Sequence, residues 1–446
     1  SVSSISSVSS VPSSLSSSSV NIVNEKYQDA CQGIMPTGVN YPARVENPYL
    51  NADLYADPDY QAQVTMAQSE VNDDELRAAM EIVKAQSTAV WIMDIEKPCG
   101  YSATGKLSFI EHIEHALAGQ GEGPLTMTLT ISNIPGREYG SFASGPGDFD
   151  ITDQGALGYQ TFIDSLAAIM ASTPRLRFAL LLEPHVLAGL ADQVVKRANS
   201  RTPLEVEPYE AFHKDNLAYA LWRFSQVSNV YAYLDVSNSD WVDSDDKEVA
   251  LIAIADEILG LANELPNSGN VQFSGFIANT LNYMAYEEPF VSELYLNRVT
   301  RISTLSVAHY IEQLRLIAED YPSLPTGFVV DSSRNGWGAP NRPTEVGDTS
   351  AFLLDKRGDK SFRCNINTAG LGVMPQADPD PDRDYMHAFF WFKPPGESDG
   401  DDNMLCVNPN SLENPPSAGE WFDEHFIQLI EYSWPRLLST FESFDS

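Results

Sequence analysis

The stretch LLLEPHVL, residues 180–187, is an apolar run that ends in a carboxylate, a proline and a histidine. Such a run predicts a buried strand, and the proline marks the turn that follows it. In an α/β barrel, a polar residue directly after a buried strand is a usual place for a catalytic group. The sequence therefore raises the question of what His185 can do at that position.

The same alternation of strand and helix continues on both sides of this stretch. Strands are predicted at residues 89–95, 125–131, 177–182, 230–235, 272–277, 327–330 and 388–392. Helices are predicted at residues 109–117, 159–172, 217–225, 248–265, 303–321 and 421–431. Strands separated by long helices indicate a parallel sheet with right-handed crossovers. Seven or eight such units predict a closed α/β barrel, with function at the carboxyl ends of its strands.

Composition and charge narrow the class of protein. The 446 residues are 43% hydrophobic and carry 62 acidic against 27 basic side chains, a net charge of -35. Such a charge repels a phosphate backbone, so we expect no nucleic-acid partner. No run approaches the roughly 18 apolar residues of a membrane span, so we expect no membrane insertion. Without a leader-like start, the chain is interpreted as a mature, secreted or cell-surface product.

The chain divides into two parts. Residues 1–24 form a serine-rich, low-complexity segment, which we interpret as an O-glycosylated stalk or a linker. Residues 25–446 are expected to form the barrel.

Four cysteines, at positions 31, 99, 364 and 406, make no C-x-x-C pair, so two disulfides are favoured over a zinc site. Three connectivities are open from the sequence. Because Cys364 and Cys406 bracket a loop-rich segment, we pair them, which leaves Cys31 with Cys99.

The predicted strand ends carry carboxylates, amides, indoles and a few cations. In chain order they are Trp91 and Asp94; residues 132–138; Glu183 and His185; Asp235, Asn238 and Trp241; Asn279, Asn282 and Tyr283; Asp331 and Arg334; and Lys393, Glu397 and Asp399. There is no glycine-rich phosphate loop and no nucleophile elbow. Indole faces stack on sugar rings while polar groups bind hydroxyls, so this set suits a carbohydrate and requires no cofactor.

Two further groups are interpreted as structural. His112 and His115 are spaced to share one helical face, which could bind a metal, but a solvated charged face is favoured and no metal site is predicted. Trp222, Trp421 and Trp434 fall in helical patterns and are expected in the core.

At this point the residues resemble a family, the glycoside hydrolase family 6 cellulases, over nearly the whole chain after the serine tract. The matching segments, in order, are NPY at 47–49, AVWIMD at 89–94, LLLEP at 180–184, YLDVSNSDW at 233–241, IANTLNY at 277–283, DSSRNG at 331–336, RCN at 363–365 and WFKPPGESDG at 391–400. The resemblance implies a distorted barrel of seven to eight parallel strands. It also implies a β-1,4-glucan partner and inverting hydrolysis by an acid and a base on opposite sides of the sugar.

The resemblance implies that this chain differs from the family at the catalytic acid and at residues around it. His185 stands where the family has the Asp of an E-P-D motif. In the stretch matching the family's L-P-D-R-D-C motif, Glu138 stands for the supporting Asp and Tyr139 for the cysteine. Ser132 stands for a tyrosine that helps to distort the sugar.

Other family positions are retained in this sequence. By resemblance, Arg137 and Ser144 lie near the family's water site, and Trp91 and Trp241 lie under sugars on either side of the cleavage point. Lys393, Glu397 and Asp399 match a sugar-binding stretch in which Asp399 is the base-like position. Asp94, Asn282 and Arg334 complete the expected substrate-binding set. The family's disulfide matches Cys364 with Cys406. Ser244 stands where the family has a further product-side tryptophan, and Arg363 stands where it has the tryptophan before the cysteine at Cys364.

Three hypotheses follow. The leading one is a secreted cellulase-like barrel with little or no hydrolysis, which binds glucan or another extracellular polysaccharide and acts in self-assembly or with other surface proteins. The second is an active β-1,4-glucan hydrolase whose acid has moved to Glu138. The third is an enzyme for a different sugar with an acidic group that pairs with His185.

Overall fold

The computed structural model describes residues 25–100, 105–137, 147–202, 204–288, 306–336, 364–401, 406 and 409–438. The serine-rich segment, Glu138 and Ser144 lie outside these residues. The predicted stalk and the roles expected of those two side chains therefore stay predictions.

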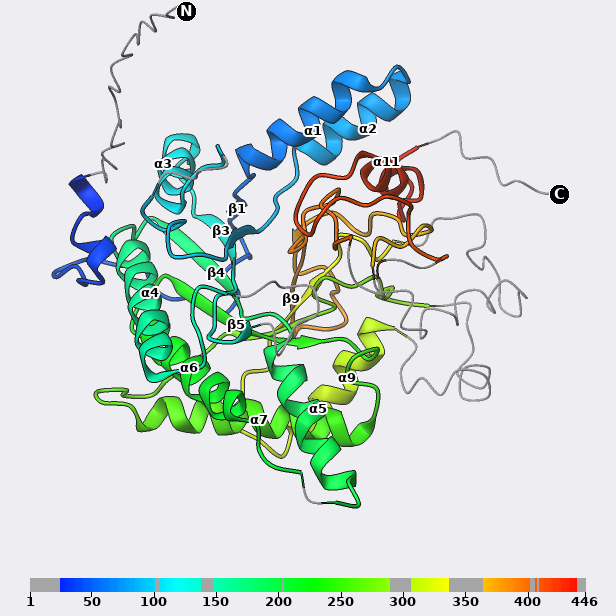
Figure 1. The fold of residues 1–446 in the computed structure, drawn as a ribbon. Helices are drawn as coiled ribbons and strands as arrows, with labels where there is room; N and C mark the ends of the chain where they lie inside the picture. Colours follow the sequence, from blue (N-terminus) through cyan, green and yellow to red (C-terminus); the bar gives the residue numbers. More distant parts are fainter. Residues whose placement is uncertain are drawn as a thin grey trace, which may run out of the picture.

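Nine strands of the described chain form one sheet in the order β1-β3-β4-β5-β6-β7-β9-β8, and β2 also pairs with β3 (Figure 1). Their bounds are β1 Asp53–Leu54, β2 Val90–Ile92, β3 Leu125–Ile131, β4 Leu176–Leu182, β5 Val230–Ser237, β6 Gly275–Ala278, β7 Phe328–Asp331, β8 Gln376–Ala377 and β9 Met386–Phe390. Every pairing is parallel except that of β8 with β9.

The sheet curls so that the segment around β2 reaches the end of β9. The Ala89 backbone N–H donates to the Trp391 carbonyl at 3.0 Å, and Thr88 and Trp391 form a parallel bridge. The Trp91 indole N–H donates to the Phe392 carbonyl at 2.8 Å. These contacts join the segment around β2 to the end of β9, so the predicted distorted α/β barrel is confirmed.

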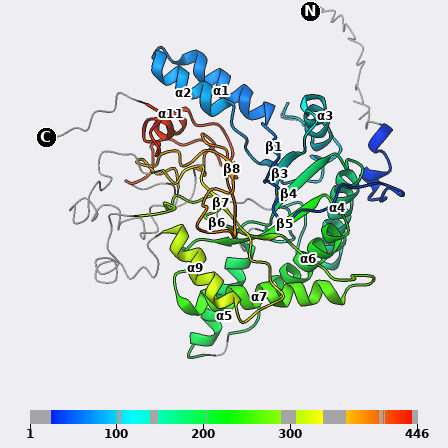
Figure 2. The same cartoon turned by 180° about the vertical axis from the view of Figure 1, so that it is seen from behind.

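Helices surround this sheet. Their bounds are α1 Pro58–Glu70, α2 Asp74–Lys84, α3 Phe109–Gly119, α4 Asp153–Ala171, α5 Val186–Asn199, α6 Pro208–Ser225, α7 Asp245–Glu264, α9 Val307–Ala318 and α11 Asp423–Glu431, with short 3-10 turns at Glu25–Tyr27 and Ala30–Gln32. Neighbours α4, α6, α7 and α9 follow one another around the outside, and α5 packs on α7 (Figures 1 and 2). The pair α1–α2 and α11 lie together on the opposite side.

Strand β4 shows how the core is divided. Phe178, Leu180 and Leu182 belong to the cluster between sheet and helices. The alternate residues, Ala179 and Leu181, belong to a separate cluster of the barrel interior. Both faces of the strand are buried from Phe178 to Leu182, which explains why these residues form a continuous apolar run rather than an alternating one.

The predicted strands and helices are largely confirmed, with shifted ends. Helices α1, α2 and α5, which carry many polar residues, were not predicted from the sequence. Trp222 and Trp421 pack against the core as predicted, but Trp434 is 42% exposed, so its prediction was wrong. It lies beyond the end of α11, where no helical face turns it inward.

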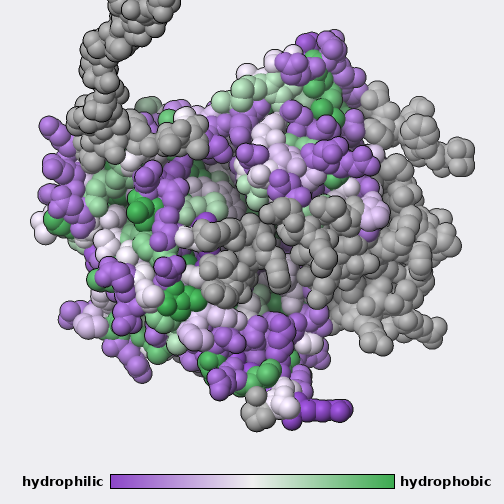
Figure 3. All heavy atoms as spheres, in the orientation of Figure 1, coloured by the Kyte–Doolittle hydropathy of each residue, from purple (hydrophilic) through white to green (hydrophobic). Residues whose placement is uncertain are grey.

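Both predicted disulfides are present, Cys31–Cys99 and Cys364–Cys406. Among the described residues, no helix combines the length and apolar character needed to cross a bilayer. Hydrophilic side chains cover much of the visible face outside the grey atoms (Figure 3), as the net charge of -35 leads one to expect.

Gly275 allows the close approach of β6 and β7, and this gives the first prediction. Its φ is +151°, and an added Cβ would lie 2.0 Å from the Gly327 carbonyl oxygen. We expect Gly275→Ala to destabilise the protein by about 3 kcal/mol, because neither backbone can move without breaking ladder hydrogen bonds. Thermal unfolding of the two proteins measures the difference.

Gly260→Ala is the matched control, since nothing lies within 4 Å of an added Cβ in this exposed part of α7. It should stabilise the protein by about 0.5–1 kcal/mol, the ordinary gain of alanine over glycine in a helix. Equal unfolding temperatures for both variants would show that the close contact is wrong.

Candidate functional site

Glu183, at the end of β4, is a buried carboxylate that holds the neighbouring loop. Its oxygens accept the backbone N–H groups of Asn133, at 3.0 and 3.1 Å, and Ile134, at 3.1 Å. The Tyr159 hydroxyl donates to it at 2.9 Å. Burial raises the pKa of Glu183 to about 7 even though these hydrogen bonds favour the charged form. The side chain is 2% exposed, so it positions the loop after β3 rather than meeting a ligand.

His185 follows two residues later as the N-cap of α5, in a left-handed conformation with φ +66°. Its backbone N–H donates to the buried Asp235 carboxylate at 2.6 Å. Its ring Nδ1 lies 3.7 Å from the same carboxylate, an ion pair when the imidazole is protonated. The ring centroid is 6.0 Å from that of Trp241. His185 and Trp241, predicted separately as site residues, are thus brought together by β4 and β5.

Arg137, Asp94 and Trp91 surround the end of β2. Arg137 is 9% exposed and donates to the carbonyls of Met93, at 3.0 Å, and Ser132. Asp94 accepts the N–H groups of the two residues that begin the next turn, Glu96 and Lys97, at 3.0 and 2.7 Å. Trp91 is partly exposed while its N–H is held by Phe392. Arg137 and Asp94 therefore have structural contacts of their own beside any role toward a sugar.

The base-like position, Asp399, sits in a dense set of donors. Arg334, which is 0% exposed, donates to Asp399 at 2.7 Å and to the Leu281 carbonyl at 2.6 Å. The Tyr283 hydroxyl and the Asn365 N–H also donate to Asp399, the latter at 2.9 Å. Burial raises the pKa of Asp399, but the charges of Arg334 and Lys393 outweigh it and lower the pKa to about 2. The carboxylate is thus held ionised.

Lys393 and Glu397 form the edge of this set. The Lys393 ammonium donates to the Ser398 carbonyl at 3.0 Å and lies 3.5 Å from Glu397. Lys106, far earlier in the chain, reaches Glu397 at 3.9 Å. Asn282 accepts the N–H of the next residue at 2.6 Å and is 4% exposed, which makes it a turn-forming residue more than an open hydrogen-bonding group.

Some contributors could not be found from the sequence. The Tyr159 hydroxyl, on α4, donates to Glu183. Nothing in the helical pattern of α4 indicates that this tyrosine makes a hydrogen bond at the strand ends. His425 of α11 is fully buried, and both of its ring nitrogens lack a hydrogen-bond partner among the described residues. Burial lowers the pKa of His425 to about 3, so its ring is neutral beside Arg334 and Asp399. Asn365 was visible only as part of the RCN segment.

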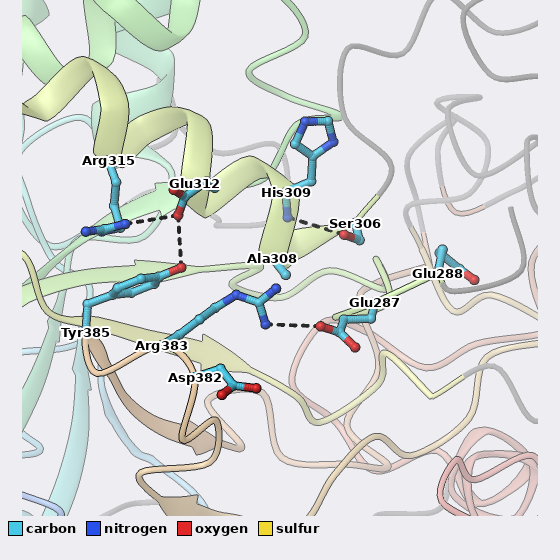
Figure 4. Close-up of a pocket in the computed structure, with 10 residues that line it drawn as sticks. All are labelled: Glu287, Glu288, Ser306, Ala308, His309, Glu312, Arg315, Asp382, Arg383 and Tyr385. Carbon is cyan, nitrogen blue, oxygen red and sulfur yellow. Dashed lines mark hydrogen bonds and ion pairs between the residues drawn. The ribbon is translucent and has the colours of Figure 1, made fainter. Parts of the chain in front are cut away.

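A cavity of about 620 Å³ lies elsewhere, beside α9 (Figure 4). Its charged groups pair with one another: Arg383 with Glu287 at 3.1 Å, and Glu312 with both Arg315 and Tyr385 at 3.0 Å. None of the predicted site residues lines it. The cavity is therefore not part of the strand-end site.

Comparison with known proteins identifies the family of this chain. Residues 49–433 match the family described as Glycosyl hydrolases family 6. Exoglucanase A of Cellulomonas fimi is 30% identical over 448 residues, which cover 90% of this chain and 50% of that protein. A probable 1,4-beta-D-glucan cellobiohydrolase C of Aspergillus terreus is 25% identical, with 87% of this chain and 76% of that protein covered. The chain thus spans only half the length of the first of these relatives.

Solved structures show the same fold. The catalytic domain of Cellulomonas fimi Cel6B superposes with a TM-score of 0.77 at 28% identity, covering 90% of this chain and 98% of that one. The catalytic domain of CcCel6A, complexed with p-nitrophenyl beta-D-cellotrioside, superposes with a TM-score of 0.68 at 23% identity, covering 88% and 99%. At that lower identity the likeness concerns the fold alone.

The Arg334–Asp399 pair generates the second prediction. We expect Asp399→Asn to destabilise the protein by about 3 kcal/mol at pH 7, because it leaves a buried guanidinium without its counter-charge. The folded-state pKa of Asp399 is lowered, so its contribution is present above the unfolded pKa of 3.8 and is lost as the pH falls through about 2. The difference between variant and wild type should therefore shrink between pH 4 and pH 2 in thermal unfolding.

Asp401→Asn is the matched control. It removes the same charge from an exposed position in the same loop, and it should change stability by less than about 0.5 kcal/mol at either pH. A deficit of Asp399→Asn that stays constant down to pH 2 would contradict the lowered pKa.

Proposed function

The chain belongs to glycosyl hydrolase family 6, and we propose that it binds β-1,4-glucan at the carboxyl ends of its strands while hydrolysing it weakly or not at all. The proposal rests on His185, directly after β4, which the resemblance aligns with the family's acid. In this proposal the protein still binds the family's ligand, but most of the hydrolytic activity is lost.

His185 is a poor replacement for a carboxylic acid. A neutral imidazole cannot protonate a leaving glycosidic oxygen as a carboxylic acid does, and an imidazolium places a positive charge beside an oxocarbenium-like transition state. A carboxylate left after proton transfer would stabilise that charge instead. Loss of a general acid typically lowers the rate by about 10²–10⁴-fold.

The base-like side supports the same conclusion. Asp399 accepts hydrogen bonds from Arg334, Tyr283 and Asn365, and its pKa is lowered to about 2. A base whose pKa lies so far below the working pH has little driving force to take a proton from water. Its contacts suit a fixed negative charge that orders the loops around β7 and β9.

Groups suited to sugar binding persist around the strand ends. Trp91 and Trp241 are each partly exposed, which is compatible with stacking of an indole on a pyranose ring. Lys393 and Glu397 lie together, 3.5 Å apart, where they offer a donor and an acceptor to sugar hydroxyls. This arrangement supports binding without requiring proton transfer.

We propose an extracellular place for this activity. Two disulfides suit an oxidising compartment, and the charge of -35 suits a soluble surface. The serine-rich segment would be an O-glycosylated stalk, and the protein would act as a glucan-binding or structural glycoprotein, alone, in self-assembly or with other surface proteins.

Hydrolysis with and without a carboxyl at position 185 tests the function. Reducing-end release from phosphoric-acid-swollen cellulose and mixed-linkage glucan, at pH 4 to 8, should be absent or very slow for the wild type. We expect His185→Asp to raise it by about 10²-fold or more. Aspartate tolerates the left-handed backbone, and beside Asp235 one of two neighbouring carboxyls would keep its proton, as an acid must.

Binding is measured separately, by calorimetric titration with cellohexaose. Wild type and His185→Asp should bind alike, and Trp241→Ala should bind at least about tenfold more weakly because a stacking face is lost. Trp222→Phe, a change in an indole of α6 that packs on Tyr219, should leave binding unchanged. Fast cleavage by the wild type that Glu138→Gln abolishes would overturn the proposal and show that the acid has moved.

A further inference from the structure

A second group of polar side chains lies outside the strand-end site, at the start of α1 and on α3. Asp57, Asp59 and His112 each present one ligand atom, and these atoms all lie within 4.8 Å of one another. From its spacing in the sequence, His112 was predicted to lie on a solvated helical face. That was wrong, because the side chain is fully buried behind Tyr55 and the two carboxylates.

The two nitrogens of His112 have different surroundings. Nδ1 shares a 3.1 Å hydrogen bond with the Tyr55 hydroxyl, which fixes the orientation of the ring. Nε2 is buried and has no hydrogen-bond partner among the described residues. It lies 3.6 Å from Asp59 Oδ2, too far for a hydrogen bond. A buried nitrogen left bare beside a carboxylate is the arrangement of a ligand atom without its ion.

The carboxylates are also held from behind. Asp57 is the N-cap of α1, and its Oδ1 accepts the Asp59 N–H at 2.8 Å. Asp59 Oδ2 accepts the Leu107 N–H at 2.9 Å. Support of this kind from neighbouring groups fixes ligand positions in metal sites. Three segments of the chain, at residues 57–59, 107 and 112, therefore converge on one point.

We propose that Asp57, Asp59 and His112 bind a divalent cation of the zinc class, with water completing the coordination. Two ligands held at about 2.1 Å in tetrahedral geometry lie roughly 3.4 Å apart. The 3.6 Å between His112 Nε2 and Asp59 Oδ2 matches this separation. One carboxylate oxygen of Asp57 lies within 4.8 Å of a ligand atom of each of the other two residues, so Asp57 can supply the third ligand.

The donor set decides the class of ion. One imidazole nitrogen with two carboxylate oxygens suits zinc and its neighbours in the first transition row, whereas calcium and magnesium prefer oxygen alone. Lys97 lies nearby, but its ammonium donates to the Leu107 carbonyl, and among the described residues it makes no ion pair with either carboxylate.

The position of the site gives the ion a consequence. Residue 107 lies beside Lys106, which reaches Glu397 at 3.9 Å, and Lys97 lies two residues before the Cys31–Cys99 disulfide. A bound cation would therefore fasten α1, α3 and the segment between them to one another. It would act on stability, whether or not the strand ends bind glucan.

The experiment titrates chelator-treated, full-length protein with ZnCl₂ in a calorimeter and follows thermal unfolding with and without the metal. We expect one zinc per chain and a rise in unfolding temperature, because the ion binds only the folded arrangement. Asp57→Asn should weaken zinc binding by about 100-fold or more. Asparagine is as good an N-cap as aspartate, so the metal-free variant should fold as the wild type does.

Two further measurements keep the result decisive. Asp59→Asn retains an oxygen for Leu107 and should weaken binding similarly, while the Co²⁺-loaded wild type should show visible absorption that both variants lose. His115→Gln removes an exposed histidine from the same helix and should bind zinc like the wild type. The proposal is overturned if the wild type takes up no zinc, if both asparagine variants bind it equally well, or if His115→Gln abolishes binding.

Discussion

Three buried carboxylates at strand ends organise the loops of this barrel, each by accepting backbone N–H groups from a neighbouring strand's loop. Glu183 of β4 holds residues 133–134 after β3. Asp235 of β5 holds the N–H of His185 after β4. Asp331 of β7 holds Leu281 after β6, at 3.0 Å, and Lys393 after β9, at 3.3 Å. A buried N–H group without an acceptor costs free energy. Each carboxylate therefore fixes the path of the loop that follows the neighbouring strand. The geometry of the strand-end site depends on this chain of contacts.

The sequence predicts the barrel well because β3, β4 and β5 are rich in apolar and β-branched residues and nearly free of charges, as strands buried on both faces require. It fails for α1, Pro58–Glu70, whose thirteen residues carry mostly polar side chains and show no clear apolar face. Helix α5 begins directly after the strand-end turn. Its N-cap, His185, has a φ of +66°, which no local sequence pattern predicts. Helices whose burial is decided by tertiary partners are hard to recognise from local sequence alone.

The site shows the same limit. The sequence could predict that Arg334 and Asp399 belong to the strand-end site, because each follows a recognisable strand. Their 2.7 Å pairing could not, because 65 residues separate them. The burial of His112 depends on Tyr55, 57 residues earlier, and so could not be predicted from its own helix. Residue types at strand ends can be predicted from the sequence, whereas charge pairing and burial depend on contacts between distant segments.

The same contacts explain why position 185 can change while its neighbours keep their roles. Removing Glu183 or Asp331 would leave several buried N–H groups without acceptors, a cost of about 1–3 kcal/mol for each. At position 185 it is the backbone N–H, not the side chain, that makes the 2.6 Å bond to Asp235. Any residue that tolerates a left-handed conformation presents that N–H equally well. The fold therefore constrains the carboxylates that build the loops more strongly than the side chain at the acid position. A barrel of this family can thus carry a histidine at position 185 while its strand-end loops keep their shape.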